Sequence, residues 1–131
     1  TTCSGTRSLL TWDKGTGGTI LTGYISQITG ETNTAGLNGL SNSDSPYIAA
    51  QTCENYDDGN GNTDWYLPAR SELNVIYGNK NVIGQFSTSG TRYWTSTEVS
   101  AGFATAQRFS DGSQGGGDLK QQAYAVRCTR K

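Results

Sequence analysis

The chain has 131 residues, a formal net charge of −1 and hydrophobic residues at only 33% of positions, yet its three Trp, seven Tyr and three Phe indicate one folded, loop-rich domain over residues 1–131. It contains no His, which excludes Ser–His and Cys–His catalysis and His-ligated zinc, so we expect no enzyme activity and no catalytic residues. No apolar run reaches the length of about 18 residues that a membrane-spanning helix needs, and the low net charge argues against nucleic-acid binding.

Two β-rich segments lie near the start of the chain. Residues 8–12 and 19–25 carry Leu, Ile, Thr, Trp and Tyr on either side of a Gly cluster at residues 14–18, which predicts a hairpin. Residues 29–45 are mostly Gly, Asn, Ser and Thr, and this composition predicts a long surface loop.

Two short helices are predicted in the middle of the chain. Ser45 and Pro46 have the residue types of a helix N-cap and a first helical position, and apolar residues follow at helical spacing. We therefore expect a helix over residues 46–56. A second helix is expected over residues 69–77, with Gly78 as its stop signal.

The last third of the chain has the pattern of strands. We expect strands over residues 93–97, 103–109 and 124–130, with an Asp-Gly turn at residues 111–112. Alternation along the last strand places three residues on the core face: Tyr124, Val126 and Cys128. Because strands occur at both ends of a small domain, we expect a common sheet. The predicted fold is α+β, with two short helices, mainly antiparallel strands and long loops.

Three cysteines, at positions 3, 53 and 128, leave one over after any pairing. A bridge between Cys53 and Cys128 closes a loop of roughly 75 residues and contributes about 4 kcal/mol by the chain-entropy estimate. The alternative, Cys3 with Cys128, ties the two ends together. We favour the bridge between Cys53 and Cys128, and with it an oxidising, extracellular location. Since the chain lacks Met and a leader segment, we expect it to be part of a longer protein.

Four motifs follow one another in the second half of the chain: D-W-Y-L-P-A-R-S-E-L-N at residues 64–74, Y-W-T-S-T-E at 93–98, F-S-D-G at 109–112 and V-R-C-T-R at 126–130. As an ordered set they resemble the C-terminal domain family of the Legionella collagen-like adhesin. The resemblance implies a C-type lectin-like fold and a bacterial surface or secreted recognition module. In the adhesin itself it implies a trimer below a collagen-like stalk that binds sulfated glycosaminoglycans.

Basic residues gather near the C-terminus. Residues 1–91 hold four Lys and Arg against eight acids, whereas residues 92–131 hold six against three. Sulfate groups favour Arg and Lys on an exposed, rigid surface. The candidate ligand-binding residues are Arg92, Arg108, Lys120, Arg130 and Lys131. The alternative is that these residues are solvated side chains on the faces of strands and bind no ligand.

A run of oxygen-bearing side chains precedes the first motif. Asp58, Asn60, Asn62 and Asp64 match positions 1, 3, 5 and 7 of a calcium-binding loop. The sixth position is Thr rather than Gly and the twelfth is Ala rather than Glu, so the pattern is incomplete. A plain Asn-Gly turn is the alternative. We expect no obligatory cofactor, with Ca²⁺ at this loop as the open candidate.

Several residues of the motifs have structural interpretations. Glu98 and Arg127 are expected to form an ion pair, because charges near a core need partners. Trp65 and Trp94 are expected in the core rather than on a sugar-binding surface. The Gly-rich residues 112–118 lack the Lys and the following helix of a phosphate loop and are interpreted as a hairpin tip or ligand loop.

The leading hypothesis is an extracellular adhesin domain on the bacterial surface, which binds sulfated or other anionic glycans as a homotrimer and mediates attachment to host or matrix. The alternative is a protein-binding, receptor-recognition tip of a surface or phage fibre protein. A third hypothesis, an enzyme similar to the lectin-like formylglycine-generating enzymes, needs reactive cysteines, and a bridge between Cys53 and Cys128 would consume two of three.

Overall fold

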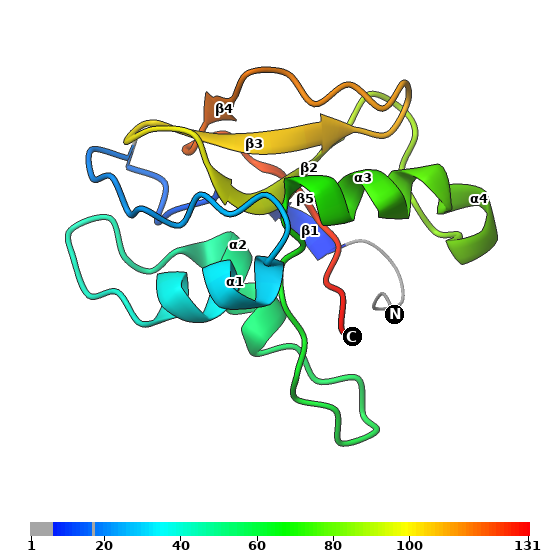
Figure 1. Cartoon of the computed structure of the whole chain (residues 1–131), viewed down its shortest axis with the longest axis horizontal. Coiled ribbons are helices and arrows are strands. Elements are labelled where there is room, and N and C mark those ends of the chain that lie inside the picture. The colour runs from blue at the N-terminus through cyan, green and yellow to red at the C-terminus, as the bar shows by residue number, and fades with distance from the viewer. Residues whose placement is uncertain (1–6, 17) are drawn as a thin grey trace.

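The computed structural model describes residues 7–16 and 18–131, and Figure 1 shows the elements they form. In these residues the elements, in chain order, are β1 Arg7–Leu10, α1 Gly30–Asn38, α2 Ile48–Glu54, α3 Arg70–Gly78, α4 Lys80–Ile83, β2 Arg92–Glu98, β3 Phe103–Arg108, β4 Asp118–Leu119 and β5 Tyr124–Val126. None of the helices among the described residues is long and apolar enough to cross a membrane.

The strands form one curled sheet in the order β1-β5-β2-β3-β4. Neighbouring strands are antiparallel except for β2 and β5, which pair in parallel with Tyr93 opposite Ala125. Helices α1 and α2 pack against each other and against β2, while α3 packs against β2 and β3; Figure 1 shows α1 and α2 below the sheet and α3 to one side. The mixed α/β fold expected from the sequence is confirmed, including the meeting of both ends of the chain in one sheet.

Two apolar clusters cover the two faces of the sheet. The larger contains Trp12, Leu37, Tyr47, Cys53, Trp65, Leu67, Trp94, Val126 and Cys128. The smaller contains Leu73, Ile76, Tyr93, Phe109 and Ala125. Since adjacent residues of β5 enter different clusters, both faces of this strand are buried. The expected alternation is therefore half right: Val126 and Cys128 lie in the core, but Arg127 and Thr129 are buried as well.

A disulfide joins Cys53 of α2 to Cys128. It fastens the helix to the segment that follows β5, across 75 positions of sequence, and its two sulfur-bearing residues are fully buried in the larger cluster. The favoured pairing is confirmed. The expected fate of Cys3 lies outside the described residues.

The loop predicted over residues 29–45 is wrong, because α1 occupies Gly30–Asn38. The buried face of this helix has helical spacing but little apolar character: Gly30, Asn33, Thr34 and Leu37. Hydrogen bonds replace apolar contacts on this face, since Asn33 Nδ2 donates to the carbonyl of Ser26 at 2.8 Å and Thr34 Oγ1 accepts the N–H of Leu67 at 3.0 Å. A polar stripe of this kind carries no hydrophobic periodicity.

The first predicted helix exists but begins later than expected. Helix α2 starts at Ile48 rather than at Pro46, because the Ser45 hydroxyl accepts the N–H of Asn42 at 3.1 Å and so does not cap the helix. The second predicted helix is confirmed to within one residue at each end, as α3. The short α4 follows it after one residue and was not expected.

Residues 18–28 form an irregular segment without strand pairing, so the hairpin expected at the start of the chain is wrong. Two buried carboxylates take the place of a neighbouring strand. Asp44 Oδ2 accepts the N–H groups of residues 19 and 20 at 2.9 Å each. Glu98 accepts those of residues 22 and 23 at 2.9 to 3.0 Å. Side chains thus satisfy backbone donors that would otherwise need a partner strand.

Candidate functional site

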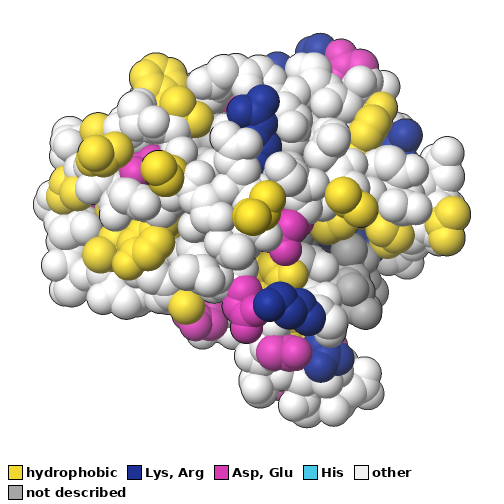
Figure 2. Space-filling model, viewed as in Figure 1, with side chains coloured by type: hydrophobic (Ala, Val, Ile, Leu, Met, Phe, Trp, Pro, Cys, Tyr) yellow, Lys and Arg dark blue, Asp and Glu magenta, His cyan; other side chains and the backbone are white. Residues whose placement is uncertain are grey.

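All five basic residues expected to bind an anionic ligand have an acidic partner in the structure. The pairs are Arg92–Asp118, Arg108–Asp111, Lys120–Glu98, Arg130–Asp64 and Lys131–Glu31. Figure 2 shows basic and acidic side chains next to each other at the top of the molecule and again near its lower edge. The pairs lie in three places that differ in burial and geometry, and the structure does not bring the five residues together into one basic surface.

Lys120 lies inside the molecule rather than on a ligand-binding surface, which corrects its expected role. Its ammonium lies 2.7 Å from Glu98 Oε2, both side chains are fully buried, and the ring of Trp12 lies 4.7 Å from the nitrogen. The expected ion pair between Glu98 and Arg127 is therefore wrong, since Glu98 pairs with Lys120. The reason is that Glu98 stands at the end of β2 beside the 18–28 segment, where Lys120 also enters.

Arg127 is buried for a different reason. Its Nη1 donates to the carbonyls of Gly84 and Gln85 at 3.2 and 3.1 Å, and its guanidinium carbon lies 4.2 Å from the centre of the Phe86 ring. Arg127 thus fastens the segment after α4 to the chain that continues β5. Carbonyl oxygens and an aromatic face both stabilise a buried guanidinium.

Arg92 and Arg108 are surface cations on neighbouring strands of the sheet. They lie directly opposite each other on β2 and β3, with side chains 25% and 37% exposed. Arg108 holds Asp111 through two hydrogen bonds, at 3.1 and 2.5 Å, and these bonds lower the pKa of Asp111 to about 2. Arg92 lies 3.9 Å from Asp118, which is a looser contact.

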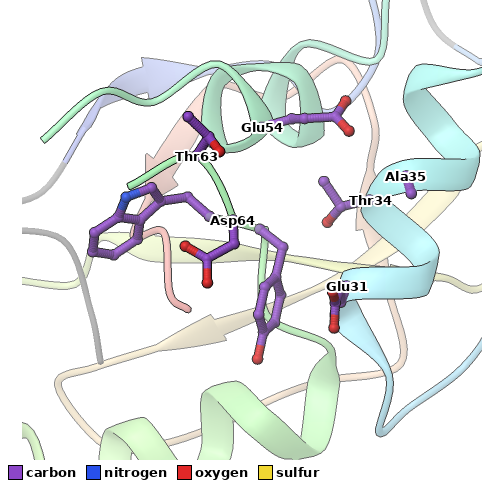
Figure 3. Close-up of a pocket in the computed structure, with 8 residues that line it drawn as sticks. Glu31, Thr34, Ala35, Glu54, Thr63 and Asp64 are labelled. Carbon is purple, nitrogen blue, oxygen red and sulfur yellow. The ribbon is translucent and has the colours of Figure 1, made fainter. Parts of the chain in front are cut away.

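Arg130 and Lys131 lie at another place, beside a cleft of about 180 Å³ lined by Glu31, Glu54 and Asp64. Figure 3 shows Glu54 reaching toward α1, with Asp64 on the far side of the cleft. Arg130 donates to both oxygens of Asp64 at 2.7 and 3.1 Å, which lowers the pKa of that carboxyl. This acidic cleft has no sequence signature, because its carboxylates are far apart in the chain.

The loop proposed to bind calcium is occupied by its own hydrogen bonds. Asp58 accepts the N–H of Asn60 at 2.8 Å and the side-chain amide of Asn62 at 2.6 Å, and the latter bond does most to lower the pKa of Asp58. Asp64 faces Arg130 instead. The structure thus brings Asp58 and Asn62 together and leaves Asp64 apart. Among the residues that the structure describes, no group of three or more Cys, Asp or Glu suits a metal ion.

The three Trp residues are part of the core. Trp65 and Trp94 are buried as expected, and Trp12 is buried too. Trp12 and Trp94 also donate their indole N–H groups to backbone carbonyls, at 2.8 and 2.9 Å. None of them offers a ring face to a sugar.

Comparisons with known proteins give one finding that covers almost the whole chain. The family model of the Lcl C-terminal domain matches residues 1–130, whereas a search of curated proteins finds no match. The family is of the adhesin type, which indicates a bacterial surface protein. The match includes the first forty-odd residues, where the motifs are weakest. The chain therefore belongs to the Lcl C-terminal domain family.

Proposed function

We propose that this chain is an extracellular, C-type lectin-like adhesin domain that binds sulfated or other anionic glycans as a homotrimer and so attaches its bearer to host or matrix. Membership of an adhesin-type family supports the class of function. The buried disulfide is in keeping with an oxidising, extracellular location, where such bonds form and persist.

The observation that carries the glycan proposal is the cross-strand pair of Arg92 and Arg108. Residues directly opposite each other in an antiparallel pair have Cβ atoms about 5 Å apart, so the two arginines share one partly exposed patch at the start of β2 and the end of β3. Planar guanidinium groups bind two oxygens at once and match the geometry of sulfate. A sulfated chain can contact both arginines together.

The acidic partners of these arginines do not prevent such binding. Ion pairs between exposed side chains contribute little, because water screens them and two flexible side chains must be ordered. A polyanion that presents several sulfates gains several contacts for each chain bound. Three copies around an axis would multiply this gain through avidity. Asp111 and Asp118 compete with the glycan for the two arginines, so only a glycan with a high density of sulfate groups displaces these two carboxylates.

Retention on a heparin column tests the proposal. The parent chain will be retained and will elute with NaCl, and Arg92→Ala combined with Arg108→Ala will elute at clearly lower NaCl. Lys80→Ala is the matched control, since it also removes a surface cation but on α4, where the ammonium lies 4.1 Å from the Tyr77 ring. Unchanged retention of the double variant, or an equal loss per charge for Lys80→Ala, contradicts the proposed site.

The oligomeric state has its own measurement. Light scattering of the isolated chain will give a mass near three times 14.0 kDa if the domain trimerises. A mass of one chain at all concentrations contradicts the trimer. If that monomer is still retained on heparin, the result supports glycan binding without trimerisation.

A further inference from the structure

Four apolar side chains lie together on the surface at the turn between β2 and β3. Ile25 is 60% exposed, Val99 45%, Phe103 42% and Leu119 39%. Val99 and Phe103 both border Gly117, where an added Cβ would meet each at 3.2 Å, and Phe103 is paired with Leu119 across β3 and β4. Figure 2 shows hydrophobic side chains gathered at the left of the molecule, where Figure 1 shows the turn between β2 and β3. We call these four residues the apolar rim.

A hollow of about 310 Å³ opens beside the apolar rim. Ile25 and Val99 line one part of it, Thr97 and Thr105 lie at its buried base, and Arg70 borders it from the start of α3. Glu98 also lines the hollow, but its carboxylate is neutralised by Lys120. The hollow therefore combines an apolar edge with one cation.

Arg70 is held in position without an acidic partner. Its Nε donates to Gln114 Oε1 at 3.2 Å, and Gln114 Nε2 donates back to the carbonyl of Arg70 at 2.8 Å. Its backbone N–H donates to Thr97 Oγ1 at 3.0 Å. In the part of the chain that the structure describes, Arg70 is in none of the five ion pairs, unlike Arg92, which faces Asp118.

We propose that the apolar rim, the hollow and Arg70 form a docking surface for an extended segment of a partner protein in which an apolar side chain stands next to a carboxylate. The apolar side chain fills the hollow against Ile25 and Val99, because contiguous exposed apolar surface is costly to leave in water. The carboxylate accepts hydrogen bonds from the remaining guanidinium N–H groups of Arg70, which suit two oxygens at once.

The position of β4 favours a peptide as the occupant. Among the described residues this two-residue strand is the last in the sheet, so no further strand lies along its outer edge, and an extended segment is the kind of partner that adds to such an edge. Leu119 of the apolar rim belongs to the same strand. A sulfated glycan has no apolar side chain for the hollow, and it would engage Arg92 and Arg108 instead. The docking surface thus rests on residues other than those proposed to bind glycans.

Selection of random heptapeptides displayed on phage against the immobilised chain tests this proposal. Enriched peptides will carry an apolar residue adjacent to Asp or Glu, and synthetic copies will bind the parent chain in fluorescence polarisation. Arg70→Gln will weaken binding by about tenfold or more, as expected for loss of hydrogen bonds between charged groups. Phe103→Ser and, as a second variant, Ile25→Ser will abolish it. Val82→Ser is the matched control, since Val82 is highly exposed on α4.

Unchanged heparin retention and unchanged unfolding midpoints in these variants show that the glycan surface and the fold are intact. Four results overturn the proposal: binding of palmitate in place of any peptide, enriched peptides without an acidic residue, peptide binding that survives Arg70→Gln, or self-association of the parent chain that Phe103→Ser abolishes. The last result would assign the apolar rim to a second copy of the chain. Binding of palmitate in place of any peptide would assign it to a fatty acid and equally refute a protein partner.

Discussion

Replacing Glu98 by Leu is expected to destabilise the chain more than replacing its ion-pair partner Lys120 by Met. Glu98→Leu leaves a fully buried ammonium whose remaining contacts among the described residues are the carbonyl of Ile20 at 3.5 Å and the face of Trp12. It also removes the acceptor for the N–H groups of residues 22 and 23. Breaking a buried pair from one side costs about 3–5 kcal/mol, and we take about 5 kcal/mol here because backbone donors are orphaned too.

Lys120→Met leaves the carboxylate in a better position. Glu98 keeps its backbone donors from the 18–28 segment, which stabilise a buried negative charge. We therefore expect a loss of about 3 kcal/mol, at the low end for a broken buried pair. The double variant has no charge at positions 98 and 120, and what it leaves unsatisfied is mainly the backbone N–H groups that Glu98 accepts in the parent. Its free energy of unfolding will therefore fall by only about 2 kcal/mol. The total stability of a small domain is about 5–15 kcal/mol.

Urea unfolding followed by Trp fluorescence, under conditions that keep the disulfide oxidised, measures all three variants. The reasoning requires the double variant to be more stable than Glu98→Leu alone, which gives a large favourable coupling between the two positions. Lys131→Met is the control, because Lys131 forms an exposed pair with Glu31 and its loss will leave the midpoint unchanged. Additive losses at positions 98 and 120, or single variants as stable as the parent, would refute the buried pair as the organiser of this region.

Three further outcomes are expected. Because Arg108 holds the pKa of Asp111 at about 2, this carboxylate keeps its charge and its ion pair at pH 4 and loses them only as the pH falls toward 2. Asp111→Asn will therefore raise the NaCl needed for elution from heparin equally at pH 7 and pH 4, and a gain that disappears at pH 4 contradicts this. Replacing Cys53 and Cys128 together by Ala will cost about 4 kcal/mol in urea unfolding, from the entropy of the loop they close; a loss below about 1 kcal/mol speaks against a structural bond. Since the loop at residues 58–64 uses its oxygens internally, heparin retention will be the same in EDTA and in millimolar CaCl₂, and a loss in EDTA restores calcium as a cofactor.

The elements that the sequence predicts well are those whose buried face is apolar. Helix α3 presents Leu73 and Ile76 to the smaller cluster at helical spacing, and its predicted range agrees with the structure to within one residue at each end. Strand β2, with its aromatic and β-branched residues, was also located closely. Helix α1 is not predicted, because two residues of its buried face, Asn33 and Thr34, are polar and form hydrogen bonds. A search for apolar residues at helical spacing does not detect such a face.

The basic residues show the same limit at the candidate site. A Lys in a polar stretch is normally exposed. Nothing around Lys120 in the sequence indicates that it forms an ion pair with Glu98, which lies 22 positions earlier in the chain. Pairing across strands, which sets Arg92 opposite Arg108, depends on the register of β2 and β3 and not on either residue alone. The disulfide was predictable because three cysteines allow few pairings, whereas ten Lys and Arg and eleven acids allow many.

In a β-strand, the same residues must pair their backbone groups with a neighbouring strand and carry side chains that suit a pleated surface. In the 18–28 segment these two requirements are separate. Here Asp44 and Glu98 hold the backbone from outside the segment, so the identity of its outward side chains, Leu21 and Ile25 among them, has little bearing on whether it folds. A library randomised at these two positions would keep its scaffold while changing its surface. The same arrangement gives evolution a place to alter what the domain recognises without rebuilding the domain.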